Sequence, residues 1–427
     1  MTGTATIDPS ARTTPDAGRT AARSLGDVVV LDAVRTPFGR AGGAFTRTRA
    51  DDLVVRCLRE LLRRNPELAP DAVDEVAIAA STQTGDQGLT LGRSAGILAG
   101  LPASVPGYAI DRMCAGALTA VTNSAAGIAA GAIDVALAGG VEHMGHHPMG
   151  DGVDPNPRFL AERLVDGSAL VMGRTAENLH DELPHVTRER ADAYAVGSQQ
   201  RYAAARAAGV FDELMVPVAG RAEDGGWTLV TADEQPRPES TVEVLAGLRT
   251  PFRPHGRVTA GNAAGLNDGA AAVLLADAGT AERLGMAPKL QMVSYAFTGV
   301  APETMGFGPI PATRKALAKA GLGIDDIGLI EINEAFAVQV LAFTDAFGLD
   351  DDDPRVNPYG GAIAIGHPLA ASGARLIGQL GHGFAAHPEV RYGLTTLCVG
   401  LGMGATVVWE NPHHHDASTT IAAGAST

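Results

Sequence analysis

The chain has 427 residues, of which 45% are hydrophobic and 4% aromatic, and its formal net charge is −15 at pH 7. This acidic balance argues against general binding to nucleic acid or to an anionic membrane surface, although a local basic patch could still receive a phosphorylated ligand. No apolar run reaches the roughly 18 residues expected of a membrane-spanning helix. Three widely spaced cysteines without a CxxC pair favour free thiols in a reducing cytosol over disulfides or zinc.

The first part of the chain alternates short apolar segments with segments of helical periodicity. Strands are expected at 28–33, 76–80, 108–113 and 134–137, and helices at 51–64, 89–101 and 115–130. Such alternation is typical of an α/β fold, in which a mixed or parallel sheet is covered on both faces by helices. The many alanines and glycines favour close packing of these layers.

From Val141 to about Pro251 the alternation breaks down, because prolines and charges are frequent and only one helix, 188–208, is expected. This stretch is interpreted as a loop domain. The alternation then returns, with a strand ending near Ala276, strands at 290–295, 327–332, 393–398 and 405–409, and helices at 311–320, 334–347 and 371–384. The two alternating parts are similar in outline, which indicates a duplicated α/β unit.

The segments of the chain follow from these patterns. They are a disordered lead-in (1–25), a first half (26–142 plus 252–277), the loop domain (143–251), a second half (278–411) and a disordered tail (412–427).

Four polar residues lie where the pattern places the ends of strands or a glycine-rich loop. His367 sits in the glycine-rich stretch 357–375, and Pro368 disfavours helical geometry at that histidine. Cys114 follows a strand and precedes a helix, where free N–H groups and the helix dipole would lower the pKa of its thiol. Cys398 ends a strand before a glycine-rich turn whose N–H groups could form an oxyanion hole. Taken singly, each cysteine could be a buried apolar residue and Asn333 an N-cap.

Four segments resemble, in order and spacing, the signature blocks of the thiolase family: 111–117 (DRMCAGA), 333–337 (NEAFA), 360–368 (GGAIAIGHP) and 398–404 (CVGLGMG). The similarity runs from about residue 27 to 410, and segment 139–149 is most similar to degradative 3-ketoacyl-CoA thiolases, including the thiolase subunit of bacterial fatty-acid oxidation complexes. The resemblance implies a thiolase fold, with two similar βαβαβαββ halves in a five-layered α-β-α-β-α arrangement and an inserted loop domain that binds CoA and substrate.

The resemblance also implies the roles of five residues. Cys114 would be the nucleophile that carries the acyl group, His367 the general base and Cys398 the general acid and base. Asn333 would hold a water that, with His367, stabilises an enolate oxygen. The amides of Cys114 and Gly400 would form a second oxyanion hole, and two half-reactions would give ping-pong kinetics.

Contacts with CoA or substrate are implied at six further positions: Arg237, Met172, Ala260, Ala264, Phe252 and Phe336. Arg237 matches a position near the CoA nucleotide, with a solvated loop arginine as the alternative. Three histidines at 143, 146 and 147 suggest a metal, but neither the family nor the carboxylate spacing supports one. No permanently bound cofactor is implied, because CoA and acyl-CoA are substrates.

The sequence departs from the family pattern at four positions. Ala370 and Leu401 stand where many members have glycine, and Ala264 replaces a serine that contacts the pantetheine in relatives. Val171 stands where short-chain biosynthetic members carry a histidine, which favours the degradative branch.

The sequence therefore predicts thiolytic cleavage of 3-ketoacyl-CoA by CoA to acetyl-CoA and a shortened acyl-CoA, in fatty-acid β-oxidation. Condensation of two acetyl-CoA molecules (an acetoacetyl-CoA thiolase) and acyl-CoA binding without turnover are the alternatives. A homodimer or homotetramer in the bacterial cytoplasm is expected, and a hydratase–dehydrogenase partner subunit is left open.

Overall fold

The computed structural model describes residues 23–222 and 224–414, so most of the expected lead-in and all of the tail after His414 lie outside the described residues. A continuous sheet runs through the molecule in the order β10-β11-β12-β9-β1-β8-β5-β3-β4, and a short strand, β2, pairs with β8. Within the described ranges no helix combines the length and the apolarity needed to cross a bilayer.

The strands fall on two sides of the sheet. The β1 side consists of β1 (Val28–Arg35), β2 (Gly39–Arg40), β3 (Glu75–Ala79), β4 (Gly107–Ile110), β5 (Val135–His143) and β8 (Asn267–Asp277). The β9 side consists of β9 (Leu290–Gly299), β10 (Ile327–Ile332), β11 (Tyr392–Val399) and β12 (Met403–Glu410). Within the described residues, the strands of the two sides pair where Val29 and Val30 of β1 meet Gln291 and Leu290 of β9.

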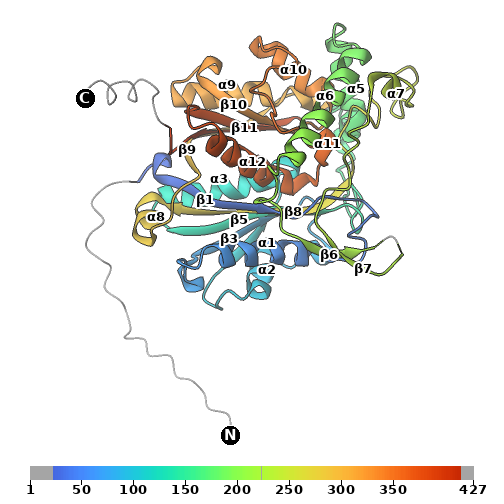
Figure 1. Ribbon diagram of the computed structural model, residues 1–427. Helices are drawn as coiled ribbons and strands as arrows, with labels where there is room; N and C mark the ends of the chain where they lie inside the picture. Colours follow the sequence, from blue (N-terminus) through green and yellow to red (C-terminus); the bar gives the residue numbers. More distant parts are fainter. Residues whose placement is uncertain (1–22, 223, 415–427) are drawn as a thin grey trace, which may run out of the picture.

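Helices cover both outer faces and fill the space between the two sides (Figure 1). The outer helices are α1 (Ala50–Arg64) and α2 (Leu91–Ala99) beside the β1 side, and α9 (Pro309–Ala320) and α10 (Ala337–Phe347) beside the β9 side. The inner layer consists of α3 (Gly116–Ala129) and α12 (Ser372–Ala386), which pack together with both sides of the sheet in one hydrophobic cluster. The expected five-layered α-β-α-β-α arrangement is therefore present.

The predicted βαβαβαββ pattern is complete on the β1 side and shortened on the β9 side. In place of a third strand, the β9 side has a single parallel bridge between Ile330 and Val356. Pro354 and Pro358 flank this bridge and lack the N–H groups that a longer ladder would need, and Asn357 has a φ of +46°.

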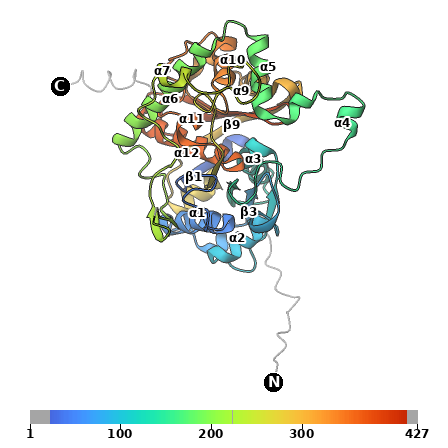
Figure 2. The same ribbon diagram turned by 90° about the vertical axis from the view of Figure 1, so that its right-hand side faces the viewer.

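The stretch between β5 and β8 contains more regular structure than the one helix that the sequence predicts. Its elements are α4 (Arg158–Ala161), α5 (Met172–Glu182), α6 (Arg188–Ala207), α7 (Val242–Ala246) and a hairpin of β6 (Val218–Arg221) and β7 (Trp227–Val230). Figure 2 shows α4 on an arm that extends away from the body of the molecule. Another short helix, α11 (Ala362–Ile365), lies inside the glycine-rich stretch before His367.

Candidate active site

The residues predicted to act together come from four places where an element begins or ends. Cys114 lies in a 3-10 turn, Met113–Ala115, that leads into α3. His367 lies between α11 and a second 3-10 turn, Leu369–Ala371, that leads into α12. Asn333 directly follows β10, and Cys398 is near the end of β11. Since β10 and β11 are parallel neighbours, their carboxyl ends bring Asn333 and Cys398 to the same edge of the sheet.

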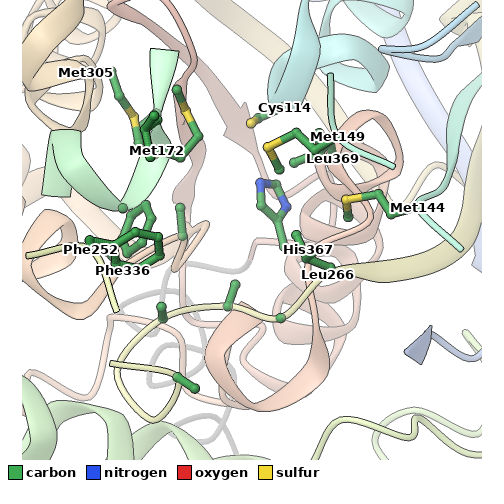
Figure 3. A pocket seen from close by; sticks show the side chains of 18 of the residues that line it. Cys114, Met144, Met149, Met172, Phe252, Leu266, Met305, Phe336, His367 and Leu369 are labelled. Atoms are coloured by element: carbon green, nitrogen blue, oxygen red, sulfur yellow. The ribbon is translucent and has the colours of Figure 1, made fainter. Parts of the chain in front are cut away.

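Cys114, His367 and Cys398 open onto one cavity of about 520 Å³, named here the main cavity. Figure 3 shows the sulfur of Cys114 and the imidazole of His367 facing this space. Five of the six predicted CoA or substrate contacts also line it: Met172, Phe252, Ala260, Ala264 and Phe336. The structure therefore brings together residues that lie up to 284 positions apart in the chain, from Cys114 to Cys398.

A second cavity of about 360 Å³, named here the side lobe, also reaches Cys114. Gly400 lines the side lobe, and a Cβ at that position would lie 2.7 Å from the sulfur of Met113, so a side chain there would have to displace that methionine. The lining is mostly apolar and consists of Ser81, Thr82, Met113, Cys114, Met149, Gly150, Val153, Pro155, Phe159, Ala169, Leu170, Met172, Leu369, Gly400 and Leu401.

Two predicted residues do not line either cavity. Asn333 is fully buried behind His367, with its amide nitrogen 3.3 Å from Nε2 and 3.4 Å from Nδ1 of that ring. Arg237 is exposed, and its guanidinium donates to the backbone carbonyl of Pro236 at 3.0 Å. The predicted contact of Arg237 with the CoA nucleotide stays a prediction.

Hydrogen bonds fix the position and the tautomer of His367. Its backbone N–H donates to Oδ1 of Asn267 at 2.9 Å. Its Nδ1 lies 2.6 Å from the hydroxyl of Ser372, and that hydroxyl donates its single hydrogen to the carbonyl of Pro368 at 3.3 Å. With its hydrogen given to Pro368, the hydroxyl accepts from Nδ1–H, and we assign His367 the tautomer in which Nε2 carries the lone pair that can take a proton.

The predicted lowering of the pKa of Cys114 is wrong. Burial raises the pKa of this thiol to about 12, although hydrogen bonds from the backbone of Gly400 and of Cys114 itself act in the opposite direction. Burial also raises the pKa of Cys398 well above its ordinary value, and burial together with the charge of Arg375 lowers the pKa of His367 to about 3. Near neutral pH the resting site therefore holds two neutral thiols and a neutral imidazole.

The two substitutions in the glycine-rich segments have different consequences. Ala370 is completely buried, and its methyl group fits because Gly116 opposite has no side chain: a Cβ on Gly116 would lie 3.0 Å from that of Ala370. Leu401 adopts a φ of +59°, the left-handed region that costs a non-glycine residue roughly 1–2 kcal/mol. The turn after Cys398 is thus strained where many family members have glycine.

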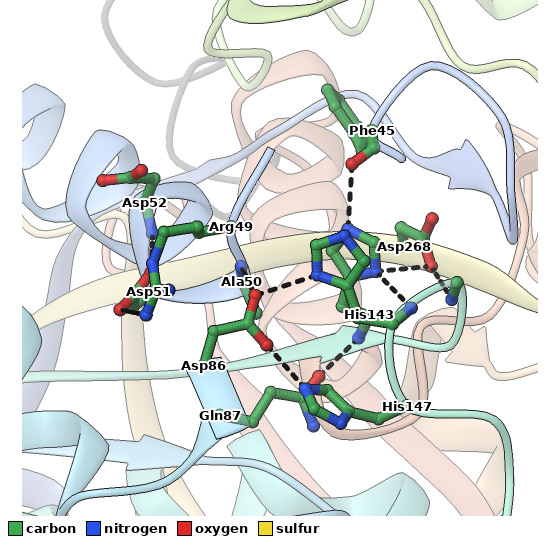
Figure 4. A network of polar contacts seen from close by, with 12 residues as sticks. Phe45, Arg49, Ala50, Asp51, Asp52, Asp86, Gln87, His143, His147 and Asp268 are labelled. Carbon is green, nitrogen blue, oxygen red and sulfur yellow. Dashed lines mark hydrogen bonds and ion pairs between the residues drawn. The ribbon is translucent and has the colours of Figure 1, made fainter. Parts of the chain in front are cut away.

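The histidines at the end of β5 (His143) and shortly after it (His146 and His147) form a polar network (Figure 4). Both nitrogens of His146 face acceptors, Asp86 and a backbone carbonyl, each at 2.9 Å; burial opposes its charge, but these hydrogen bonds raise its pKa. His147 contacts the other carboxylate oxygen of Asp86, and His143 faces a backbone carbonyl at 3.0 Å and stacks on His146. In residues 23–222 and 224–414 no group of three or more His, Cys, Asp or Glu side chains is arranged to hold a metal ion.

Three residues that contact the predicted site were not singled out from the sequence: Asn267, Ser372 and Arg375. Ser372 and Arg375 belong to the same glycine-rich stretch as His367, and Asn267 is the first residue of β8. All three are almost completely buried. A polar side chain within a small-residue segment is a signal of such a role, because burial requires it to have a partner.

Comparisons with known proteins agree with this architecture. The family models for the N-terminal and C-terminal domains of thiolase match residues 28–279 and 286–411. A 3-oxoadipyl-CoA/3-oxo-5,6-dehydrosuberyl-CoA thiolase of Escherichia coli (strain K12) is 43% identical, and a 3-ketoacyl-CoA thiolase of Escherichia coli O1:K1 / APEC is 44% identical; each match covers 90% of this chain and 99% of the relative.

Two solved structures extend the comparison. Human mitochondrial 3-ketoacyl-CoA thiolase in complex with CoA superposes with a TM-score of 0.82 at 35% identity, over 91% of this chain and 98% of the human chain. The acetyl-CoA acetyltransferase of Bacillus anthracis superposes with a TM-score of 0.81 at 36% identity, over 92% of this chain and 100% of the other. The chain belongs to the thiolase family.

Proposed function

We propose that this thiolase cleaves a 3-ketoacyl-CoA with free CoA, giving acetyl-CoA and a shortened acyl-CoA. The observation that carries the proposal is that two cysteines and one histidine, Cys114, Cys398 and His367, open onto a single, largely apolar cavity. A thiol beside a histidine base is a nucleophile for acyl groups, and a second thiol supplies the proton transfers that carbon–carbon cleavage needs.

The first half-reaction would transfer the acyl group to the protein. The sulfur of Cys114 attacks the ketone carbon while Nε2 of His367 takes the thiol proton, since Nδ1 is already committed to Ser372. The carbon–carbon bond then breaks, its electron pair leaves on acetyl-CoA, and Cys398 protonates the resulting carbanion. Because the resting pair is neutral, proton transfer accompanies the attack, as in general-base catalysis.

The second half-reaction would release the product. The thiolate of Cys398 takes the proton of an incoming CoA thiol, and the CoA sulfur attacks the acyl group on Cys114. The sulfur of Cys114 leaves and recovers its proton from the imidazolium of His367. The proton on His367 returns to Cys114, and the proton of the CoA thiol replaces the one that Cys398 gave to acetyl-CoA, so neither a metal nor a redox cofactor is part of the proposed cycle.

Developing negative charge on oxygen would be stabilised at two places. The backbone amides of Gly400 and Cys114 lie beside the Cys114 sulfur and can donate to the oxygen of the carbon bonded to it. A water held by the Asn333 amide would, together with His367, serve the enolate oxygen of the leaving acetyl-CoA; the amide nitrogen lies 3.3 Å from Nε2 of that histidine.

The side lobe supports an apolar acyl chain as the substrate class. None of its lining residues in the described part of the chain is charged. Each methylene buried there would contribute about 0.8 kcal/mol, whereas an unpaired carboxylate costs several kcal/mol to bury. The second candidate substrate, 3-oxoadipyl-CoA, comes from the name of the Escherichia coli relative and carries such a carboxylate.

A series of kcat/KM values tests this proposal. We expect 3-ketodecanoyl-CoA to exceed acetoacetyl-CoA by at least about tenfold, and 3-ketohexanoyl-CoA to exceed 3-oxoadipyl-CoA, which has the same chain length. A preference for 3-oxoadipyl-CoA would contradict the apolar substrate class, and activity confined to acetoacetyl-CoA would favour the short-chain alternative.

Covalent catalysis has its own test. Incubation with acetyl-CoA should add one acetyl group by intact mass, and Cys114→Ser should abolish it. A wild-type protein that binds acyl-CoA without forming the adduct would instead be a binding protein.

The proposal includes the surroundings of the reaction. Met149, Leu170 and Met172 line the main cavity, which supports the role of 143–251 as a loop domain that binds CoA and substrate. All three cysteines are free, as suits a reducing bacterial cytoplasm. The same proposal includes a homodimer or homotetramer, with or without a hydratase–dehydrogenase subunit. Light scattering of the protein alone, and of the protein mixed with such a subunit, would measure the mass of the assembly.

A further inference from the structure

A buried arginine contacts the site from behind. Arg375 lies on the first turn of α12, three residues after Ser372, and only 1% of its surface is exposed. Its Nη2 donates to Oδ1 of Asn333 at 3.0 Å, and its Nη1 donates to Oε1 of Gln379 at 3.0 Å. The guanidinium thus donates these two hydrogen bonds to neutral amide oxygens.

This arrangement is unusual for an arginine that serves stability alone. A buried guanidinium usually forms a bidentate pair with a carboxylate, because desolvating the charge is costly. The carboxylate of Glu331 lies 3.8 Å from Nη1, which is beyond hydrogen-bond distance. Gln379 links the two groups, since its amide nitrogen donates to Glu331 at 3.3 Å.

The contact decides the orientation of the Asn333 amide. A guanidinium has only donors, so the amide atom beside it must be the oxygen, and the amide nitrogen must face His367. In the flipped orientation two donors would face each other at Arg375, and a carbonyl oxygen would face the imidazole of His367 and could not donate to a water there. Arg375 therefore excludes the orientation that would oppose catalysis.

We propose that Arg375 is a positioning residue that acts through Oδ1 of Asn333 and keeps the amide nitrogen turned to His367 and to the water that Asn333 would hold for the substrate oxygen. This inference rests on the proposed thiolase chemistry. The first turn of α12 would then orient two groups of the site, because Ser372 directs the imidazole of His367 and Arg375 directs the amide of Asn333. The charge of Arg375 has a second effect, because after burial it is the next cause that lowers the pKa of His367, to about 3.

A double-mutant cycle tests the proposal, with the single-turnover rate of 3-ketodecanoyl-CoA cleavage as the readout, because this half-reaction forms the enolate that Asn333 would serve. We expect Arg375→Met to lower this rate roughly 10- to 100-fold, the range for loss of one charge-assisted hydrogen bond, while KM changes less than about threefold. In an Asn333→Ala background the same substitution should change the rate less than about threefold, because the atom through which it acts is absent.

The matched control removes the other contact of the same guanidinium. Gln379→Met deletes a buried hydrogen bond of the same length, 3.0 Å, and leaves the contact of Arg375 with Asn333 in place. We expect a comparable loss in thermal stability and a rate within about threefold of wild type. A purely structural arginine would instead make Gln379→Met and Arg375→Met equally slow.

The outcomes separate the two proposals. If wild type cleaves 3-ketodecanoyl-CoA but Arg375→Met slows this cleavage equally with and without Asn333, the positioning role is overturned and the thiolase chemistry stands. If wild type neither cleaves this substrate nor forms an acyl adduct on Cys114, the proposed function itself fails. Should Arg375→Met not fold, the cycle is run with Arg375→Lys, which retains the charge but not the planar fork, and the presence or absence of coupling to Asn333→Ala decides in the same way.

Discussion

The hydroxyl of Ser372 is a small group on which the proposed general base depends. It accepts Nδ1–H of His367 at 2.6 Å, in a place where both residues are at least 95% buried. Ser372→Ala would leave this N–H without a partner and would free the imidazole to adopt the other tautomer, in which Nε2 carries hydrogen and cannot accept a proton.

The size of the effect follows from the cost of an unmade hydrogen bond. Leaving a buried donor unsatisfied costs about 1–3 kcal/mol, and the cost is greatest when the imidazole becomes positively charged during the attack of Cys114. Since about 1.36 kcal/mol corresponds to a factor of ten in rate, we expect acylation to be roughly 5- to 150-fold slower.

The assay is single-turnover acetylation of Cys114 by acetyl-CoA, quenched in acid and followed by intact mass. Ser294→Ala is the matched control, because its hydroxyl also makes a short buried hydrogen bond, 2.7 Å to the carbonyl of Ala316, but lies on β9 and lines neither cavity. Both variants should lose similar stability, and only Ser372→Ala should lose rate. Acetylation at the wild-type rate in Ser372→Ala would refute the tautomer assignment.

Three further predictions concern protons and packing. With a pKa of about 3, His367 is expected to stay an unprotonated base down to acidic pH, so the acid limb of kcat/KM should lie below about pH 5. An acid limb near pH 6.5 would contradict the lowered pKa of His367. Cys398→Ala is expected to slow cleavage of 3-ketodecanoyl-CoA at least about 100-fold, as measured by chromatography of the CoA products. Cleavage at the wild-type rate would assign the proton transfers to another group. Gly404→Ala is expected to cost at least about 3 kcal/mol in urea unfolding, since its Cβ would collide with the carbonyl oxygen of Gly308, whereas Gly167→Ala, with no atom within 4 Å, should unfold like wild type.

The sequence located some elements to within one residue. The strand predicted at 327–332 coincides with β10, and the helix predicted at 188–208 differs from α6 by one residue. The end of β5 was missed, because Gly139 and Gly140 look like a turn. In the structure they continue the strand: a Cβ would lie 2.2 Å from the carbonyl oxygen of Ala271 at the first and 2.1 Å from that of Ala370 at the second. These glycines allow close packing, and local sequence does not distinguish that need from a turn.

The same limit applies to the site. The sequence predicts which side chains gather around His367, and the cavity contains Cys114 and Cys398 as expected. It does not predict their ionisation, because the pKa of Cys114 depends on how much water the folded chain excludes and not on the start of α3 alone. Nor does it predict that Arg375 contacts Asn333, because that contact joins α12 to the end of β10 and depends on how the two elements pack.

Few residue pairs join the β1 and β9 sides. The acylation rate should therefore depend strongly on how these two sides are placed relative to each other. Cys114 reaches the main cavity from the β1 side, whereas His367 and Cys398 come from the β9 side. Apart from the two residue pairs between β1 and β9, the inner helices α3 and α12 keep these groups in register, and they touch so closely that a Cβ on Gly373 would lie 2.7 Å from the backbone nitrogen of Leu118. A misplacement of about 1 Å can cost a reaction a factor of 100. A small displacement of α12 along α3 would therefore lower the acylation rate even where it is too small to change a spectroscopic measure of folding.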